Sequence, residues 1–261
     1  MRLRWAHFKL LRREITAKFM STKFRFSASR ALLLLLVLGW ATAVSAQSYG
    51  FVSPNTKENL KLNEAIRQMN SPEELHLRDQ AVNLSCVVKT KIRASRALGS
   101  WSDGAEHSVV LRLNSDEPTL RYVLSRMGRE AQQKYVIYFH PEANGEDDLY
   151  ILRVPARNLA ALATTLNRAG VPFGTFVRSR ETTTIYIIDL NRELGPKIVA
   201  AARRLRARFS LQTGNADLFG DDKREQARVK FEQEIKDYET KNPNLPPTCN
   251  APRKTVEVTN Q

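Results

Sequence analysis

The stretch that decides the fold class is residues 109–177, which read VVLRLNSDEPTLRYVLSRMGREAQQKYVIYFHPEANGEDDLYILRVPARNLAALATTLNRAGVPFGTFV. Residues 108–113 are rich in Val and Leu and predict a strand. Cap-forming and acidic residues followed by proline at 114–118 indicate the start of a helix. The aromatic and β-branched run at 135–139 predicts a second strand, so the stretch begins as strand, helix, strand.

The second part of the stretch repeats this order. Residues 141–148 are expected to form a connection with Asn144-Gly145 at its centre, which is typical of a hairpin. Residues 149–154 predict a strand, and the helix after it can be capped by Asn158 and ended by Gly170. Residues 171–177 predict the last strand of the stretch.

The complete order is strand, helix, strand, strand, helix, strand, which resembles the ferredoxin-like sandwich in element order alone. We therefore expect an α+β core with a ferredoxin-like arrangement at 105–214. A further strand at 182–190, a helix at 193–206 and a short strand at 209–212 extend this core by one β-α-β unit. An offset of 36 residues aligns the unit at 149–177 with the unit at 185–213; either a repeat or chance explains this, and we favour chance.

The segments on either side of the core are predicted to be mostly helical. Residues 47–104 are expected to form a helical N-terminal arm and linker, with an extended lead-in at 47–56, a helix at 54–69, a second helix at 72–88 and a loop at 97–104. We expect Leu75, Val82 and Cys86 to face inward from the second helix. The segment 215–240 is expected to be the C-terminal helix, with a turn at 215–220 before the helix proper at 221–240. The apolar stripe of this helix is Ala227, Phe231, Ile235 and Tyr238. A Pro-rich tail at 241–261 completes the chain.

The first 46 residues have the pattern of a secretory signal peptide. Basic residues precede the apolar run 31–38, and Val44-Ser45-Ala46 fits a cleavage site before Gln47, with 41–43 as a second choice. Met20 begins a leader of ordinary length, so we expect it to be the true start. The prediction is a periplasmic or secreted protein; the alternative is an uncleaved leader that anchors the protein to the membrane.

The positive charge of the chain lies largely in this leader. The formal net charge is +14, and residues 1–46 hold nine Lys/Arg and one Glu, which accounts for eight of these charges. The remainder is only mildly basic, and aromatic residues are not interleaved with its basic residues as in single-strand nucleic-acid grooves. We therefore expect no specific nucleic-acid binding.

Two cysteines, Cys86 and Cys249, remain after the leader. An even number in an oxidising compartment favours one disulfide between them. The alternative is a buried Cys86 and a free Cys249. The sequence contains no Cys-x-x-Cys, so it offers no support for a thioredoxin-type or zinc-ribbon site.

Four residues are candidates for catalysis. His107 ends a loop and is preceded by Glu106, but neighbouring strand residues point to opposite faces, so we do not expect these two side chains to converge. His140 follows the strand at 135–139, and Asp189 closes the apolar run 185–188. In each case a turn, cap or surface residue is the preferred interpretation.

A second group of candidates would bind an anion. These arginines are Arg178, Arg180, Arg203 and Arg206. A solvated surface is again the preferred interpretation. No metal-ligand cluster and no cofactor-binding motif is visible in the sequence, so we expect neither a metal nor a cofactor.

These observations favour a non-catalytic function. We expect an exported binding, adaptor or assembly protein with a protein partner in the cell envelope. One alternative is a periplasmic hydrolase that uses His107 or His140. The other is an envelope protein anchored by its leader, which would then be its only membrane contact.

Overall fold

The computed structural model describes residues 47–54, 71–101, 104–171, 174–178, 182–246 and 249. The leader predicted at 1–46 lies outside the described residues, as does nearly all of the helix predicted at 54–69. Residues 46–261 form one unit, and the description below concerns that unit.

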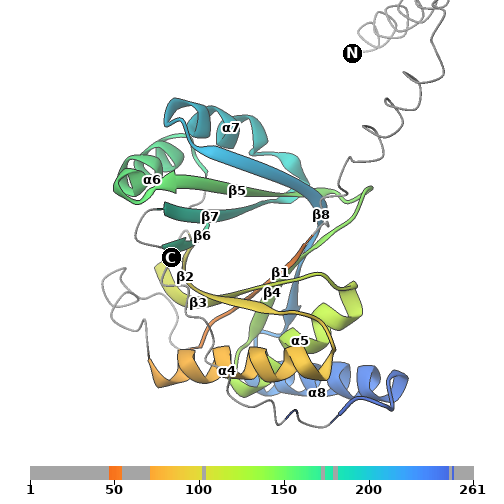
Figure 1. Cartoon of the computed structure of the whole chain (residues 1–261). Helices are drawn as coiled ribbons and strands as arrows, with labels where there is room; N and C mark the ends of the chain where they lie inside the picture. Colours follow the sequence, from red (N-terminus) through yellow and green to blue (C-terminus); the bar gives the residue numbers. More distant parts are fainter. Residues whose placement is uncertain are drawn as a thin grey trace, which may run out of the picture. The chain divides into compact units, whose positions relative to one another are not determined.

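The described residues contain eight strands. These are β1 (Ser48–Val52), β2 (Arg93–Trp101), β3 (Gly104–Leu113), β4 (Tyr135–Pro141), β5 (Asp147–Pro155), β6 (Thr175–Arg178), β7 (Thr182–Asp189) and β8 (Arg208–Gly220). They form one closed barrel in the order β1-β3-β2-β6-β7-β5-β8-β4 (Figure 1). Every neighbouring pair is antiparallel, and the β2–β6 contact consists of the single pair Leu98 and Phe176.

The described residues also contain five α-helices. These are α4 (Pro72–Val87), α5 (Glu117–Glu130), α6 (Leu159–Arg168), α7 (Gly195–Arg204) and α8 (Arg224–Lys241). Figure 1 shows α6 and α7 beside the strands β5 and β7, and α4, α5 and α8 beside the strands of the first half. Among these described helices, none combines the length and the apolar character needed to cross a membrane.

The sheet consists of two halves with the same order of elements. Strands β1 to β4 with α4 and α5 form the first half, and strands β5 to β8 with α6 and α7 form the second. In each half the fourth strand neighbours the first, the first neighbours the third and the third neighbours the second. The two halves meet where equivalent strands pair, β2 with β6 and β4 with β8.

This pairing corrects the boundaries of the core predicted from the sequence. The stretch 109–177 contributes part of β3 and the strands β4, β5 and β6. No two of these four strands pair with each other. Its elements have the predicted type and order, but they belong to two different halves. The further strand, helix and strand are present as β7, α7 and β8, so the α+β class is confirmed.

Two strands lie in the segment that was predicted to be a helical arm and linker, residues 47–104. The expected lead-in contains β1, and the expected loop at 97–104 is mostly β2. In addition, the expected turn at 215–220 is the second part of β8, and the helix predicted to begin at 221 begins at Arg224. Both faces of β1 are buried, and Gly50 allows this because a Cβ there would lie 2.5 Å from Cδ2 of Leu124.

Helix α4 begins where the sequence predicts but buries a different face. Ser71 caps it by accepting a hydrogen bond from the Glu74 backbone N–H at 3.2 Å, with Pro72 in the first turn. The buried residues are Glu74, Leu77, Ala81, Leu84 and Val87. The predicted inward residues Leu75 and Val82 are instead 48% and 39% exposed. The apolar residues of this helix fit two faces, and the sheet beneath it selects one.

Helix α8 is held by the face that the sequence predicts. Ala227, Phe231 and Ile235 are buried, and the Tyr238 ring stacks on Tyr122 with 4.3 Å between ring centroids. The Tyr238 hydroxyl also lies 2.8 Å from the Thr119 hydroxyl of α5. These contacts join α8 to residues of α5 that are distant in sequence. Tertiary packing, and not local helix preference alone, therefore fixes the position of α8.

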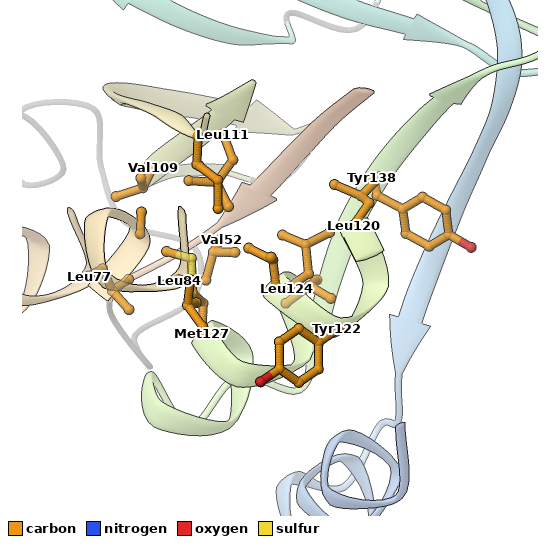
Figure 2. Close-up of a cluster of buried hydrophobic side chains, with 14 of the residues drawn as sticks. Val52, Leu77, Leu84, Val109, Leu111, Leu120, Tyr122, Leu124, Met127 and Tyr138 are labelled. Atoms are coloured by element: carbon orange, nitrogen blue, oxygen red, sulfur yellow. The ribbon is translucent and has the colours of Figure 1, made fainter. Parts of the chain in front are cut away.

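Three groups of buried side chains form the core. The first lies between α4, α5, α8 and the first half of the sheet, and Figure 2 shows part of it, including Leu77, Leu111 and Leu124. The second lies between α6, α7 and the second half. The third combines interior residues of both halves, among them Tyr49, Phe139 and Tyr186. Leu98 of the first half also belongs to the second group, whereas the third group draws several residues from each half and forms the interior of the closed sheet.

Candidate functional site

The interior face of the sheet is set by the alternation of side chains along each strand. Tyr49 and Phe51 of β1 point inward, whereas Val52 packs against the helices of the first half. Ile151 of β5 lies opposite Tyr186 of β7, and both belong to the interior group. Aromatic residues therefore enter the same space from both halves.

A cavity of about 440 Å³ opens beside this interior group. Its apolar lining includes Phe51, Ile137, Tyr186, Ile188, Ala216 and Leu218. Leu190 and Leu218 also line it and are 57% and 51% exposed, so the cavity is open to solvent between apolar residues. This volume lies in the range of small-molecule sites, which are mainly apolar with a few polar groups.

Besides Tyr186, the acidic or hydroxyl-bearing residues of the lining are Thr175 and Asp217. Asp217 lies opposite Tyr138, which belongs to the first core group, so the Asp217 side chain points to the helix side of the sheet and not into the cavity. The Asp217 carboxylate accepts a hydrogen bond from the Tyr138 hydroxyl at 3.3 Å and another from the Leu218 backbone N–H at 2.7 Å. Burial, together with the neighbouring Glu117 and Asp217, raises the pKa of Tyr138 far above its ordinary value. Tyr138 therefore stays protonated and donates to both carboxylates, which holds the Asp217 side chain on the helix side of the sheet. Thr175, opposite Tyr186, faces the cavity.

The turn after β7 that carries Leu190 is held by hydrogen bonds. Asp189 accepts from the Leu194 backbone N–H at 2.8 Å, and Asp147 accepts from the Asn191 backbone N–H at 2.9 Å. Asn191 and Arg192 adopt left-handed backbone conformations with φ of 54° and 57°. Such conformations are unfavourable for residues other than glycine and persist only when the surroundings fix them. The carboxylates of β5 and β7 provide that restraint.

Tyr49 and Tyr186 lie together in the interior, with 5.5 Å between their ring centroids. Burial raises the pKa of both hydroxyls, while the nearby charges of Arg112 and Arg153 oppose that rise. A side-chain hydrogen bond with Gln212 also acts on Tyr49. Because the pKa of each tyrosine stays above its ordinary value, both hydroxyls remain neutral hydrogen-bond donors at physiological pH.

The structure places His107 in a structural contact rather than in a cleft. Its imidazole is fully buried under α4, and Nε2 lies 3.0 Å from the Glu74 carboxylate. Glu74 also accepts hydrogen bonds from Arg96 at 2.9 and 3.2 Å. A buried ring held in this way is not accessible to a substrate in this conformation.

The neighbouring candidate Glu106 points to the other face of β3. Its carboxylate accepts a hydrogen bond from the Ser108 hydroxyl at 3.1 Å. Ser108 lies opposite Ala97, a member of the interior group. The expectation that Glu106 and His107 do not converge is therefore confirmed.

His140 and Asp189 each make a structural contact, and the two contacts are in different parts of the sheet. His140 Nδ1 is 2.9 Å from the Ser48 hydroxyl, so it links the neighbouring strands β4 and β1. Asp189 is fully buried and accepts the Leu194 backbone N–H, as expected of a turn residue. In the sheet order, β7 is separated from β3 by β2 and β6. The structure therefore does not unite Asp189 with His107.

The predicted anion-binding arginines do not form one group in the described part of the chain. Arg180 and the Arg178 side chain are outside it, whereas Arg203 and Arg206 are exposed at the end of α7. Arg204 lines a hollow between α6 and α7 of about 290 Å³ with Arg168 and Lys197. Within the described residues, no three His, Cys, Asp or Glu side chains are grouped to hold a metal ion.

Sequence reasoning missed the cavity because its lining comes from residues that are distant along the chain. Phe51 lies in a segment predicted to be an extended lead-in, and Leu218 lies in a segment predicted to be a turn. The only usable signal was the Tyr49-Gly50-Phe51 alternation, which places two aromatic side chains on one face.

Glu74 was missed because an acidic residue in the first turn of a helix is already explained by its favourable interaction with the helix dipole.

A comparison of the chain with known protein families, curated proteins and solved structures gives no match.

Proposed function

We propose that this protein is an exported, non-catalytic binding protein that holds an uncharged apolar small molecule in the cavity between Phe51 and Leu218. The observation that carries the proposal is the cavity itself, about 440 Å³ in volume and open between Leu190 and Leu218. Transfer of an apolar ligand out of water is favoured by about 25 cal/mol for each Å² of apolar surface buried. Thr175 offers a polar contact in its lining.

Filling the cavity is expected to abolish this binding. The variant Ala216→Phe places an aromatic ring in the lining, and we expect it to weaken binding of the uncharged dye N-phenyl-1-naphthylamine at least about tenfold, equal to ~1.4 kcal/mol. The measurement is a fluorescence titration of the full chain. A matched control is Val229→Phe, which adds the same ring on α8 where Val229 is 55% exposed.

The control should bind the dye as the unmodified protein does, and both variants should retain the same circular dichroism spectrum. Equal dye binding by Ala216→Phe and the unmodified protein would place the dye elsewhere and contradict the proposal. No dye binding by the unmodified protein would contradict it as well.

Export is the second part of the proposal, and the leader pattern at 1–46 supports it. The expected result is a protein recovered outside the cytoplasm whose first residue is Gln47, as measured by N-terminal sequencing. An N-terminus before Ala41 would contradict cleavage, and resistance to carbonate extraction would then favour the anchored alternative. A protein partner in the cell envelope stays a prediction, which affinity capture of the exported protein would test.

We further propose that each half of the sheet is a ferredoxin-like sandwich. The support is the order β-α-β-β-α-β in each half, together with strand neighbours that run fourth, first, third, second. The interior space then arises because the edge strands of one half pair with the equivalent edge strands of the other. An experimental structure in which β4 and β8 are not paired would contradict this description.

A further inference from the structure

Four arginines are placed on the interior face of the sheet: Arg93 on β2, Arg112 on β3, Arg153 on β5 and Arg208 on β8. Arg93 lies directly opposite Arg112, and Arg153 lies directly opposite Arg208. Directly opposite residues on antiparallel strands project from the same face. Arg112 is also opposite Tyr49, and Arg153 is two residues from Ile151, so the interior residues define that face.

All four arginines lie at the same end of the closed sheet. Because the ring is antiparallel throughout, β2 and β8 run in the same direction, and each begins with its arginine. The pair on β2 and β3 is separated from the pair on β5 and β8 by two strands in either direction around the ring. The two pairs therefore lie on opposite sides of the ring at the same end of the sheet.

This end is opposite to the cavity. Along β1, Tyr49 lies beside Arg112, whereas Phe51 lines the cavity. Along β7, Thr184 lies beside Arg153, whereas Ile188 lines the cavity. The Tyr49–Tyr186 pair lies between the two regions. A ligand at the arginine end is thus independent of the apolar ligand proposed for the cavity.

The arginines lack counter-charges within the described residues, where no carboxylate lies within ion-pair distance of any of the four. Like charges directly opposite each other on neighbouring strands destabilise a sheet. In addition, Arg112 Nε is buried and has no hydrogen-bond partner among the described residues. An added oxyanion would offset the repulsion and accept from the free guanidinium groups.

We propose that this end of the sheet is a binding site for a small polyanion that carries phosphate or carboxylate groups, held by Arg93, Arg112, Arg153 and Arg208. The planar guanidinium group matches both kinds of oxyanion through paired hydrogen bonds. Tyr49 and Tyr186 form the floor of the site as neutral donors. This site differs from the arginines predicted from the sequence, because Arg203 and Arg206 lie on the outer surface at the end of α7.

The test is isothermal titration calorimetry of the full chain with inorganic pyrophosphate and, in a separate arm, citrate. We expect binding of at least one of them by the unmodified protein and a loss of at least about tenfold in affinity in the double variant Arg112→Gln/Arg153→Gln. The matched control, Arg203→Gln/Arg206→Gln, removes the same charge from the outer surface and should change affinity less than about twofold. The arm that binds more tightly identifies phosphate or carboxylate as the preferred group.

A second variant keeps the test decisive if the first one unfolds. Arg93 and Arg208 are exposed, so Arg93→Gln/Arg208→Gln should fold normally and still lose at least about threefold in affinity. Absence of binding by the unmodified protein to either anion overturns the proposal. Equal losses in the control and in the interior variants also overturn it, because they indicate only a general effect of net charge. Neither result bears on dye binding in the cavity.

Discussion

Replacement of Glu74 with alanine is expected to lower the free energy of unfolding by about 3–5 kcal/mol. The Glu74 carboxylate is fully buried and lies 3.0 Å from His107 Nε2, 2.9 Å from Arg96 Nε and 3.5 Å from Arg78 Nη1. Removal of the carboxylate leaves these groups without their shared acceptor in a site of low polarity. The loss of a buried partner costs more than the pair itself contributes, since the remaining groups stay desolvated.

The measurement is urea unfolding of the full chain at neutral pH. Glu73→Ala is the matched control because Glu73 is exposed in the same first turn of α4, and its loss should lower the free energy of unfolding much less than the loss of Glu74. Similar unfolding free energies for the two variants would show that Glu74 acts only through the helix terminus. That result would contradict a buried ionic cluster beneath α4.

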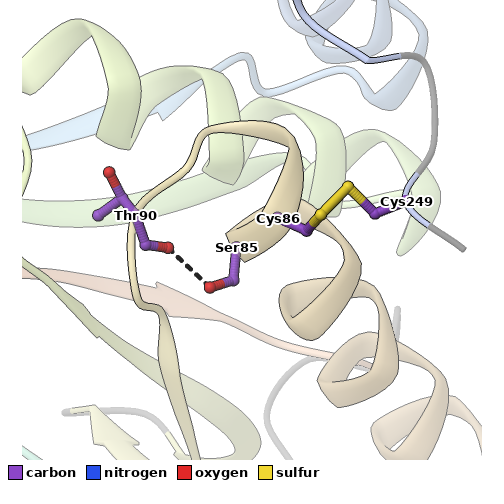
Figure 3. The surroundings of a disulfide bond; sticks show 4 residues. All are labelled: Ser85, Cys86, Thr90 and Cys249. Carbon is purple, nitrogen blue, oxygen red and sulfur yellow. Dashed lines mark hydrogen bonds between the residues drawn. A yellow bond between two sulfur atoms is a disulfide. The ribbon is translucent and has the colours of Figure 1, made fainter. Parts of the chain in front are cut away.

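Removal of the disulfide is expected to lower the free energy of unfolding by about 2–5 kcal/mol. Cys86 at the end of α4 is bonded to Cys249, at a sequence separation of 163 residues and with 6.0 Å between their Cα atoms (Figure 3). A link of this length restricts the unfolded chain strongly in the chain-entropy model. Leu245 and Cys249 also pack against the first core group, so the bond holds this segment in place.

The variant Cys86→Ser/Cys249→Ser tests this expectation in the same urea experiment. The unmodified protein should lose a similar amount of stability when a reductant is added, whereas the double variant should not respond to the reductant. Two free thiols in the denatured, unreduced protein would contradict the bond. The disulfide predicted from the even number of cysteines is the one that the structure contains.

Some of the fold could be predicted because local signals were strong. The start of α5 is one example, since Asp116 accepts a hydrogen bond from the Thr119 backbone N–H at 3.1 Å, as the cap signal predicts. The stripe of Ala227, Phe231 and Ile235 on α8 is another. In both cases residues three or four apart carry the information, so the neighbouring sequence is sufficient.

The candidate site could not be predicted in this way. Strand β2 reads RASRALGSW, whose charges and glycine do not suggest a strand, and its stability comes from pairing with β3. The preference of a residue for a strand depends on its cross-strand neighbours, which a local reading does not contain. The cavity combines Phe51 with Ile188 and Leu218, and the arginine end combines Arg93 with Arg208. These groups exist only after the sheet has closed.

The sequence by itself determined the α+β class, the order of elements from β3 to α8, the buried stripe of α8 and the pairing of the two cysteines. The tertiary structure alone decided that the strands of 109–177 are divided between two halves, that α4 buries Leu77 rather than Leu75, and that His107 meets Glu74. The physical reason is the sequence separation over which each interaction acts. Helix caps and side-chain periodicity act over a few residues, whereas β4–β8 pairing joins residues such as Tyr135 and Gly220, which only the folded chain brings together.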